Sequence, residues 1–203
     1  MLFNSFIFIF FFIAVLLVYY LAPKKNSNYV LLVSSYIFYS YVDYRFSILL
    51  LGITLLTYFV ANQIVSSKEH KRKKTFLIYG VVLNLLVLGI FKYYNFFLSS
   101  IIPLFSEIGI NADAFHIKLI LPIGISFYVF QALSLIIDTY LNDESKPFKL
   151  ISVSVFLSFF PTVMAGPIER AHRIIPQLEK EKSFTRENFN KGFALISIGY
   201  LRK

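Results

Sequence analysis

The sequence predicts an all-α polytopic membrane protein, with about five transmembrane helices plus one broken, re-entrant helix, as part of a larger helical bundle. Of the 203 residues, 57% are hydrophobic and only 15% are charged, whereas a soluble domain has roughly 45–50% and ~25%. The charged residues stand in short clusters between long apolar runs. One such run, residues 121–140, has the ~20 residues that a helix needs to cross a ~30 Å hydrocarbon core.

The charge and the cysteine content exclude several function classes. The net charge of +9 suggests nucleic acid at first sight, but the basic residues cluster at the ends of the apolar runs. Basic residues at such positions orient the spans in the membrane and contact lipid head groups. We therefore expect a lipid bilayer, and no nucleic acid, as the partner of these residues. With no cysteine in the sequence, the chain has no disulfide framework and no thiolate nucleophile.

Residues 1–65 are predicted to hold the first three spans. The run 6–22 is free of charge, no positive charge precedes it and no small-residue cleavage site follows it. We read it as a retained span with its N-terminus outside, not as a cleaved signal peptide. The run 29–42 is shorter and rich in aromatic residues, and 46–65 is the third span. The basic cluster 68–74 that follows indicates a cytoplasmic loop.

Residues 75–141 are predicted to form two long spans, the second of which carries polar side chains. Tyr128, Gln131 and Asp138 lie within it. A central aspartate costs roughly 2.5–3.5 kcal/mol on insertion scales, so these groups should face other helices or a wet cavity. Hydrogen bonding between helices and the lining of a cavity are equally good explanations. All three residues are candidates for lining a substrate funnel.

The next apolar run is short for a straight span, and it contains Pro161, which removes a backbone donor that lipid does not replace. A full crossing would place the basic residues that follow outside, whereas a re-entrant path keeps them in the cytoplasm. We prefer the re-entrant path for 150–167, followed by a cytoplasmic surface segment at 168–189. Residues 190–203 then start a truncated helix, so 1–203 is expected to be a single membrane domain that is cut short.

Three stretches together resemble the membrane-bound O-acyltransferase family, in its alginate O-acetyltransferase-like bacterial branch. They are LPIGISFYVFQALSLIIDTY (121–140), FFPTVMAGPIERAHRIIPQL (159–178) and GIFKYYNFF (89–97). Each motif alone is weak, but they occur in the family's order. The resemblance covers the N-terminal portion of such an enzyme.

The resemblance implies a membrane enzyme of the cell envelope. Such an enzyme takes an acetyl or acyl group from a cytoplasmic thioester donor, acetyl-coenzyme A or an acyl carrier, and has no bound cofactor. It passes the group toward an exported polysaccharide or cell-wall polymer, with an extracytoplasmic acetyltransferase as partner. The implied location is the inner (cytoplasmic) membrane, in multi-pass form.

The residues themselves supply no catalyst. The family's essential histidine lies in a tryptophan-rich segment, whereas this chain has no Trp and its three histidines do not match that motif. We therefore expect that histidine beyond Lys203 and assign no catalytic residue and no metal site. The 203-residue chain alone is expected to be inactive.

Two arginines stand beside the backbone break at Gly166-Pro167. Arg170 and Arg173 are candidates for meeting the anionic head of a coenzyme A or phosphopantetheine donor. Anchoring to lipid head groups is the competing interpretation, and the more common one for such arginines. At the level of function, the alternatives to a transferase are a non-catalytic membrane binding or transport subunit and a degraded remnant.

Overall fold

All regular structure in the described residues is helical, which confirms an all-α membrane protein. The computed structural model describes residues 5–107, 120–142, 146–164, 166–180 and 184–201. The elements are α1 (Phe6–Leu21), η1 (Lys24–Asn26), α2 (Ser27–Ser40), α3 (Tyr44–Ser66), α4 (His70–Glu107), α5 (Ile125–Leu141), α6 (Leu150–Ser158), α7 (Ala171–Glu179) and α8 (Arg186–Leu201).

Within the described residues, two helices are long and apolar enough to cross a membrane, α3 and the part of α4 from His70 to Ser100. The helices α1 and α5 are apolar but shorter. Large apolar side chains stay exposed on the outer faces of α1, α3 and α4. Such faces suit a protein whose surroundings are hydrocarbon, because lipid does not penalise exposed apolar surface. The number of crossings stays a prediction.

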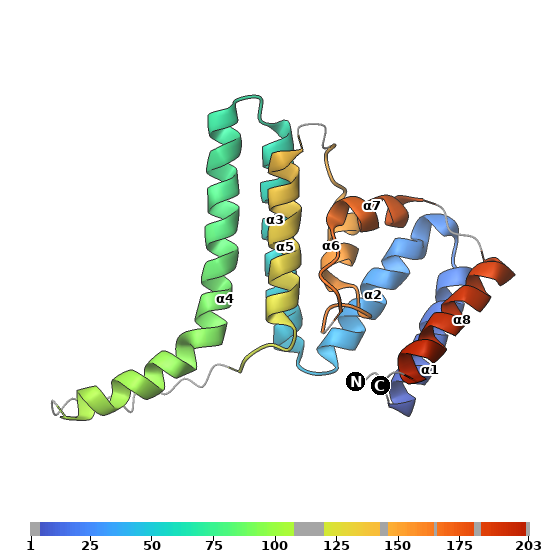
Figure 1. The fold of residues 1–203 in the computed structure, drawn as a ribbon, viewed down its shortest axis with the longest axis horizontal. Coiled ribbons are helices and arrows are strands. Elements are labelled where there is room, and N and C mark those ends of the chain that lie inside the picture. Colours follow the sequence, from blue (N-terminus) through green and yellow to red (C-terminus); the bar gives the residue numbers. More distant parts are fainter. Residues whose placement is uncertain (1–4, 108–119, 143–145, 165, 181–183, 202–203) are drawn as a thin grey trace.

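The helices α3, α4 and α5 form the central part of the fold (Figure 1). The helices α4 and α5 are antiparallel. Gly80 of α4 lies against Ile136 of α5 and Val60 of α3. A Cβ atom at Gly80 would lie only 2.7 Å from Val60 Cγ1. This is the close backbone approach that small residues permit between membrane helices.

A capped turn joins α2 to α3. The Asp43 side chain accepts a hydrogen bond from the Arg45 backbone N–H at 2.9 Å, which satisfies a free donor at the start of α3. The Arg45 guanidinium also donates to the carboxylate. Hydrogen bonds from the Arg45 side chain and backbone lower the pKa of Asp43 below its ordinary value. The polar residues between α2 and α3 therefore serve as a helix N-cap.

The segment from α6 to α7 enters and leaves the bundle at the same end (Figure 1). With nine residues, α6 is about 13 Å long, less than half of a ~30 Å hydrocarbon core. The chain then turns back through Pro161, and α7 ends beside the start of α6. There Ser152 Oγ donates to Glu179 Oε1 at 3.1 Å. The chain thus turns back on itself, and a re-entrant path of 150–167 in the membrane stays a prediction.

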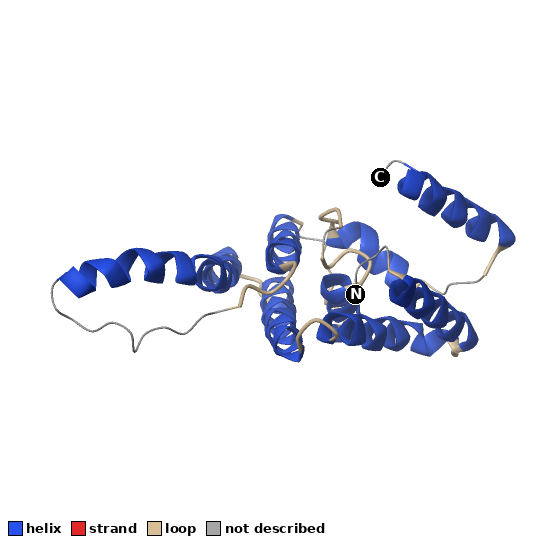
Figure 2. Ribbon diagram, turned by 90° about the horizontal axis from the view of Figure 1, so that it is seen from below, coloured by secondary structure: helices blue, strands red, loops and turns tan. Residues whose placement is uncertain are grey.

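Two parts of the chain reach away from this core. Figure 1 shows that the second half of α4 bends outward, and Figure 2 shows α8 set apart from the other helices. The last helix begins at Arg186, four residues before the predicted position. Thr185 Oγ1 accepts a hydrogen bond from the Asn188 backbone N–H at 3.3 Å at this start. The predicted surface segment 168–189 thus contains α7 and the first turn of α8.

Candidate functional site

A cluster of charged and polar side chains lies where the end of α5 meets the start of α7. Asp138 Oδ1 lies 3.4 Å from Arg170 Nη1, and its Oδ2 lies 3.8 Å from His172 Nδ1. Ser134, one turn earlier on α5, donates to Asp138 Oδ2 at 3.4 Å. The Asp138 side chain is 23% exposed, whereas the side chains of Arg170 and His172 are more than half exposed. The carboxylate is therefore the fixed centre of the cluster.

The start of the short helix α7 presents Arg170 and His172 to Asp138. Arg170 is its N-cap residue with an extended backbone, and helical geometry begins at Ala171. Ala171 and Ile175 are buried, one turn apart, and hold α7 against the bundle. Their burial leaves His172 and Arg173 on the exposed side. The amphipathic pattern of this helix thus places Arg170 and His172 at the rim of the bundle.

A cavity of about 500 Å³ adjoins this cluster. Asp138, Arg170 and His172 lie on its wall, together with Asn142 and Lys146 from the connection that leads to α6. The wall has both apolar and polar parts, since Leu135, Phe148 and Ile175 also line it. Three side chains with N–H donors, those of Lys146, Arg170 and His172, share this wall with two carboxylates, those of Asp138 and Glu179. Such a wall suits a polar ligand.

The connection at Phe148 is tied to α3 by one side chain. Asn62 Oδ1 accepts from the Phe148 backbone N–H at 2.8 Å, and Asn62 Nδ2 donates to the Phe148 carbonyl at 3.2 Å. This paired contact bridges 86 positions of sequence and holds one wall of the cavity.

Replacing Asn62 by alanine is expected to lower the free energy of unfolding by about 2 kcal/mol, because two hydrogen bonds are lost and two backbone groups lose their partners. The thermal midpoint of the purified protein in detergent measures this. Asn188→Ala, on the exposed side of α8, is the matched control and should leave the midpoint unchanged. Equal midpoints for the two variants would show that the Asn62 contact does not hold the connection.

The structure separates the other predicted site residues from this cluster. Tyr128 and Gln131 are buried at 0% and 3% exposure, but neither is on the wall of the cavity at Asp138. The ring of Tyr128 lies edge-on to Tyr39 of α2, with the centroids 6.2 Å apart. Within the described residues, neither the Tyr128 hydroxyl nor Gln131 Oε1 has a hydrogen-bond partner of acceptable geometry. Arg173 is exposed and is also absent from the wall.

The sequence analysis singled out none of four further members of the site, which are Asn142, Lys146, His172 and Glu179. For His172 the signal is its spacing: it follows Arg170 by two positions at the start of a short amphipathic helix. Nothing in the local sequence points to Asn142 or Lys146, because only the folded connection brings them to the cavity.

Comparison with known proteins gives full-length matches to this chain. A probable alginate O-acetylase of Pseudomonas aeruginosa is 35% identical over 205 aligned positions, which cover all of this chain and 39% of that protein. The corresponding protein of Azotobacter vinelandii is 34% identical, with all of this chain and 41% of that protein covered. The chain is homologous to the alginate O-acetylases from its first residue to its last. The resemblance to the alginate O-acetyltransferase-like branch is thereby confirmed.

Two further proteins that match this chain have names that refer to polymers other than alginate. A peptidoglycan O-acetyltransferase of Helicobacter pylori is 30% identical over the whole chain and 44% of its own length. A teichoic acid D-alanyltransferase of Bacillus subtilis matches 40% of the chain at 31% identity, over 21% of its own length. These relatives are consistent with the membrane-bound O-acyltransferase family. No family model and no solved structure matches the chain.

This chain spans about two fifths of the length of the alginate O-acetylases that it matches. The described site offers N–H donors beside two carboxylates, and the named relatives transfer acyl groups to polysaccharides or cell-wall polymers.

Proposed function

We propose that this chain is the N-terminal part of a membrane O-acyltransferase. The enzyme moves an acetyl or acyl group from a cytoplasmic thioester donor toward an exported polysaccharide or cell-wall polymer. The observation that carries the proposal is the homology to alginate O-acetylases over the entire chain. Because the chain spans 39% of that relative, its contribution is one part of the machinery. The catalytic histidine expected from the resemblance belongs to another part.

The proposed contribution of this chain is the entrance for the donor. The head of coenzyme A or of a phosphopantetheine carrier is anionic, and arginine binds phosphate through two parallel N–H donors. Arg170 stands on the cavity wall, where Asp138 orients its guanidinium. Lys146 and His172 add donors on the same wall. For Arg173, which lies outside the cavity, contact with lipid head groups is the better assignment.

The proposed topology follows from the distribution of charge. The predicted loop 68–74 is helical from His70, and this start of α4, which carries Lys71 and Lys74, lies at the same end of the bundle as α7 (Figure 1). By the positive-inside rule this end faces the cytoplasm. It is also the end at which a cytoplasmic donor arrives. The N-terminus then lies outside, the membrane is the inner (cytoplasmic) one, and the partner that completes transfer is an extracytoplasmic acetyltransferase.

A second candidate function, a non-catalytic binding or transport subunit, rests on one specific observation. Tyr128 and Gln131 bury polar atoms without hydrogen-bond partners in the described part of the bundle. Such atoms are costly in a membrane protein unless a solute, an ion or water reaches them.

The amount of ester on the exported polymer tests the proposal. We expect deletion of the gene to lower the ester-linked acyl content per unit of polymer severalfold, with the amount of polymer unchanged. Restoring the gene should restore the ester. A transport subunit predicts the reverse pattern, with less polymer and a normal ester content. A remnant predicts no change in either quantity and no protein in the membrane fraction.

A further inference from the structure

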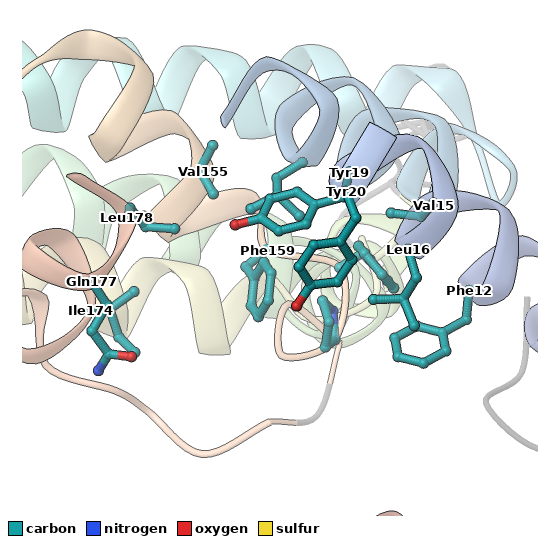
Figure 3. Close-up of a pocket in the computed structure, with 13 residues that line it drawn as sticks. Phe12, Val15, Leu16, Tyr19, Tyr20, Val155, Phe159, Ile174, Gln177 and Leu178 are labelled. Carbon is teal, nitrogen blue, oxygen red and sulfur yellow. The ribbon is translucent and has the colours of Figure 1, made fainter. Parts of the chain in front are cut away.

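A second cavity lies on the other side of the bundle, between α1, α6 and α7. Its volume is about 320 Å³ and its wall is almost entirely apolar. Figure 3 shows Phe12, Leu16 and Tyr20 of α1 on one side, Ile174 and Leu178 of α7 on the opposite side, and Phe159 between them. The cavity is partly open to the surroundings. An elongated apolar ligand would fit such a wall.

The depth of this cavity matches one leaflet of a bilayer. Phe12 lies nine residues before Leu21, the last residue of α1, which is about 13 Å along the helix axis. Half of a ~30 Å hydrocarbon core is about 15 Å. Tyr19 and Tyr20, near the end of α1, are the aromatic residues typical of the interface. The cavity therefore runs from the interface toward the middle of the membrane.

A polar cavity of about 370 Å³ adjoins the apolar one at the same end of the bundle. The two share Tyr19 and Leu178 on their walls. Three separate segments bring Lys25, Lys149 and Lys180 to the polar cavity. Their charges exceed the single carboxylate on this wall, which belongs to Glu179.

The Glu179 carboxylate already interacts with neighbouring side chains. Glu179 Oε1 accepts from Ser152 Oγ at 3.1 Å and lies 3.9 Å from Lys149 Nζ. The floor of the polar cavity is also fixed, since Asn28 Nδ2 donates to the Leu178 carbonyl at 2.9 Å. A preformed basic cavity therefore stands at interface level directly above an apolar cavity.

We propose that these two joined cavities bind one anionic phospholipid, with an acyl chain in the apolar cavity and the phosphate among the three lysines. The polar cavity shares Glu179 with the cavity at Asp138, but none of its three lysines lines that cavity. The proposal therefore goes beyond the proposed acyl transfer. Charge complementarity selects the anionic lipid: each lysine near a membrane surface contributes about 1 kcal/mol toward an anionic lipid, which is about fivefold in affinity. The lipid would bridge α1, α2, α6 and α7.

The absence of tryptophan from the chain permits a site-specific measurement. Phe12→Trp places one fluorophore on the wall of the apolar cavity. The protein is reconstituted in phosphatidylcholine vesicles that contain a minor fraction of phosphatidylglycerol with brominated acyl chains, because bromine quenches tryptophan on contact. We expect the quenching to exceed, several times over, the value that the mole fraction of phosphatidylglycerol predicts. Brominated phosphatidylcholine at the same fraction in phosphatidylglycerol vesicles should quench less than its mole fraction predicts.

Phe59→Trp is the matched control. Phe59 is 56% exposed on α3, seven residues from the end of that helix, so its depth is similar. Quenching there should follow the mole fraction of either lipid.

Charge variants then test the basic cavity. In the Phe12→Trp background, Lys25→Gln, Lys149→Gln and Lys180→Gln together should reduce the excess of phosphatidylglycerol at least tenfold. The same change at three exposed lysines of the loop before α4 and its first turn, Lys68, Lys71 and Lys74, should leave the excess intact.

Three outcomes would overturn the proposal. One is quenching at Phe12→Trp that follows the mole fraction. Another is equal quenching by both lipids, which would indicate an ordinary lipid-facing groove. The third is an excess that survives loss of the three lysines but disappears on addition of coenzyme A, which would assign this cavity to the donor. Retained phosphatidylglycerol, measured by native mass spectrometry of the purified chain, provides a readout that needs no reconstitution.

Discussion

Replacing Gly124 by alanine is expected to destabilise the folded protein by about 3 kcal/mol or more. Gly124 is the N-cap residue of α5 and has a φ of 78°, in the left-handed region that favours glycine. Strain of this kind costs about 1–3 kcal/mol for other residues. A Cβ atom would also collide with the Val163 carbonyl oxygen and lie 3.1 Å from Met164 Cα. Both are backbone atoms, so no change of rotamer relieves the overlap.

Loss of this packing should also disturb the candidate site, because the contact of Gly124 with Val163 and Met164 joins the start of α5 to the turn after α6. The measurement is the thermal midpoint of the protein in detergent, together with the yield of monodisperse protein. Gly52→Ala is the matched control: it lies inside α3 with open space around it, and alanine is the better helix former there. A midpoint for Gly124→Ala within a degree of Gly52→Ala would refute the proposed packing.

Replacing Arg170 by glutamine is expected to raise the dissociation constant for the thioester donor about tenfold to a hundredfold. A hydrogen bond to a charged group contributes about 1.5–3 kcal/mol, and 1.4 kcal/mol corresponds to a factor of ten. Glutamine keeps much of the length of the side chain but removes the charge and the paired N–H donors. Ser134 and His172 still contact Asp138, so the local structure should persist.

Binding of labelled acetyl-coenzyme A to membrane vesicles that contain the protein measures this effect. Arg173→Gln is the matched control, since Arg173 is three residues away on the same short segment but outside the cavity. The dissociation constant of the Arg173→Gln variant for acetyl-coenzyme A should stay within about threefold of that of the unchanged protein. Equal losses at the two positions would indicate general attraction of an anion to a basic surface, and no loss at either would remove the donor from this cavity.

The helical architecture was predictable from the sequence because it depends on local patterns. Apolar runs of sufficient length require helices in lipid, where every backbone polar group must be satisfied internally. The three motifs at 89–97, 121–140 and 159–178 likewise pointed together to the alginate O-acetylases, to which the whole chain is similar. The short run before Pro161 indicated a path that turns back, and α6 ends at Ser158, three residues before that proline.

The composition of the site was only partly predictable. Asp138 and Arg170 were both candidates, but 32 positions separate them and no spacing rule connects them. Tyr128 and Gln131 share a helix with Asp138, and the sequence alone treats the three alike. The packing of α5 against α3 and α4, and of Tyr128 against Tyr39 of α2, separates them, because it buries the first two and leaves Asp138 at the rim.

By itself the sequence determined the class of protein, the apolar helices and the relationship to acyltransferases, because hydrophobicity and motif identity are properties of neighbouring residues. Tertiary structure alone decided which polar groups meet. Asp138 pairs with Arg170 and His172 because α7 folds back onto the end of α5, and Lys25, Lys149 and Lys180 converge because three separate segments end at the same level. The physical reason is that such pairings depend on how helices dock over long sequence distances, where local periodicity carries no information.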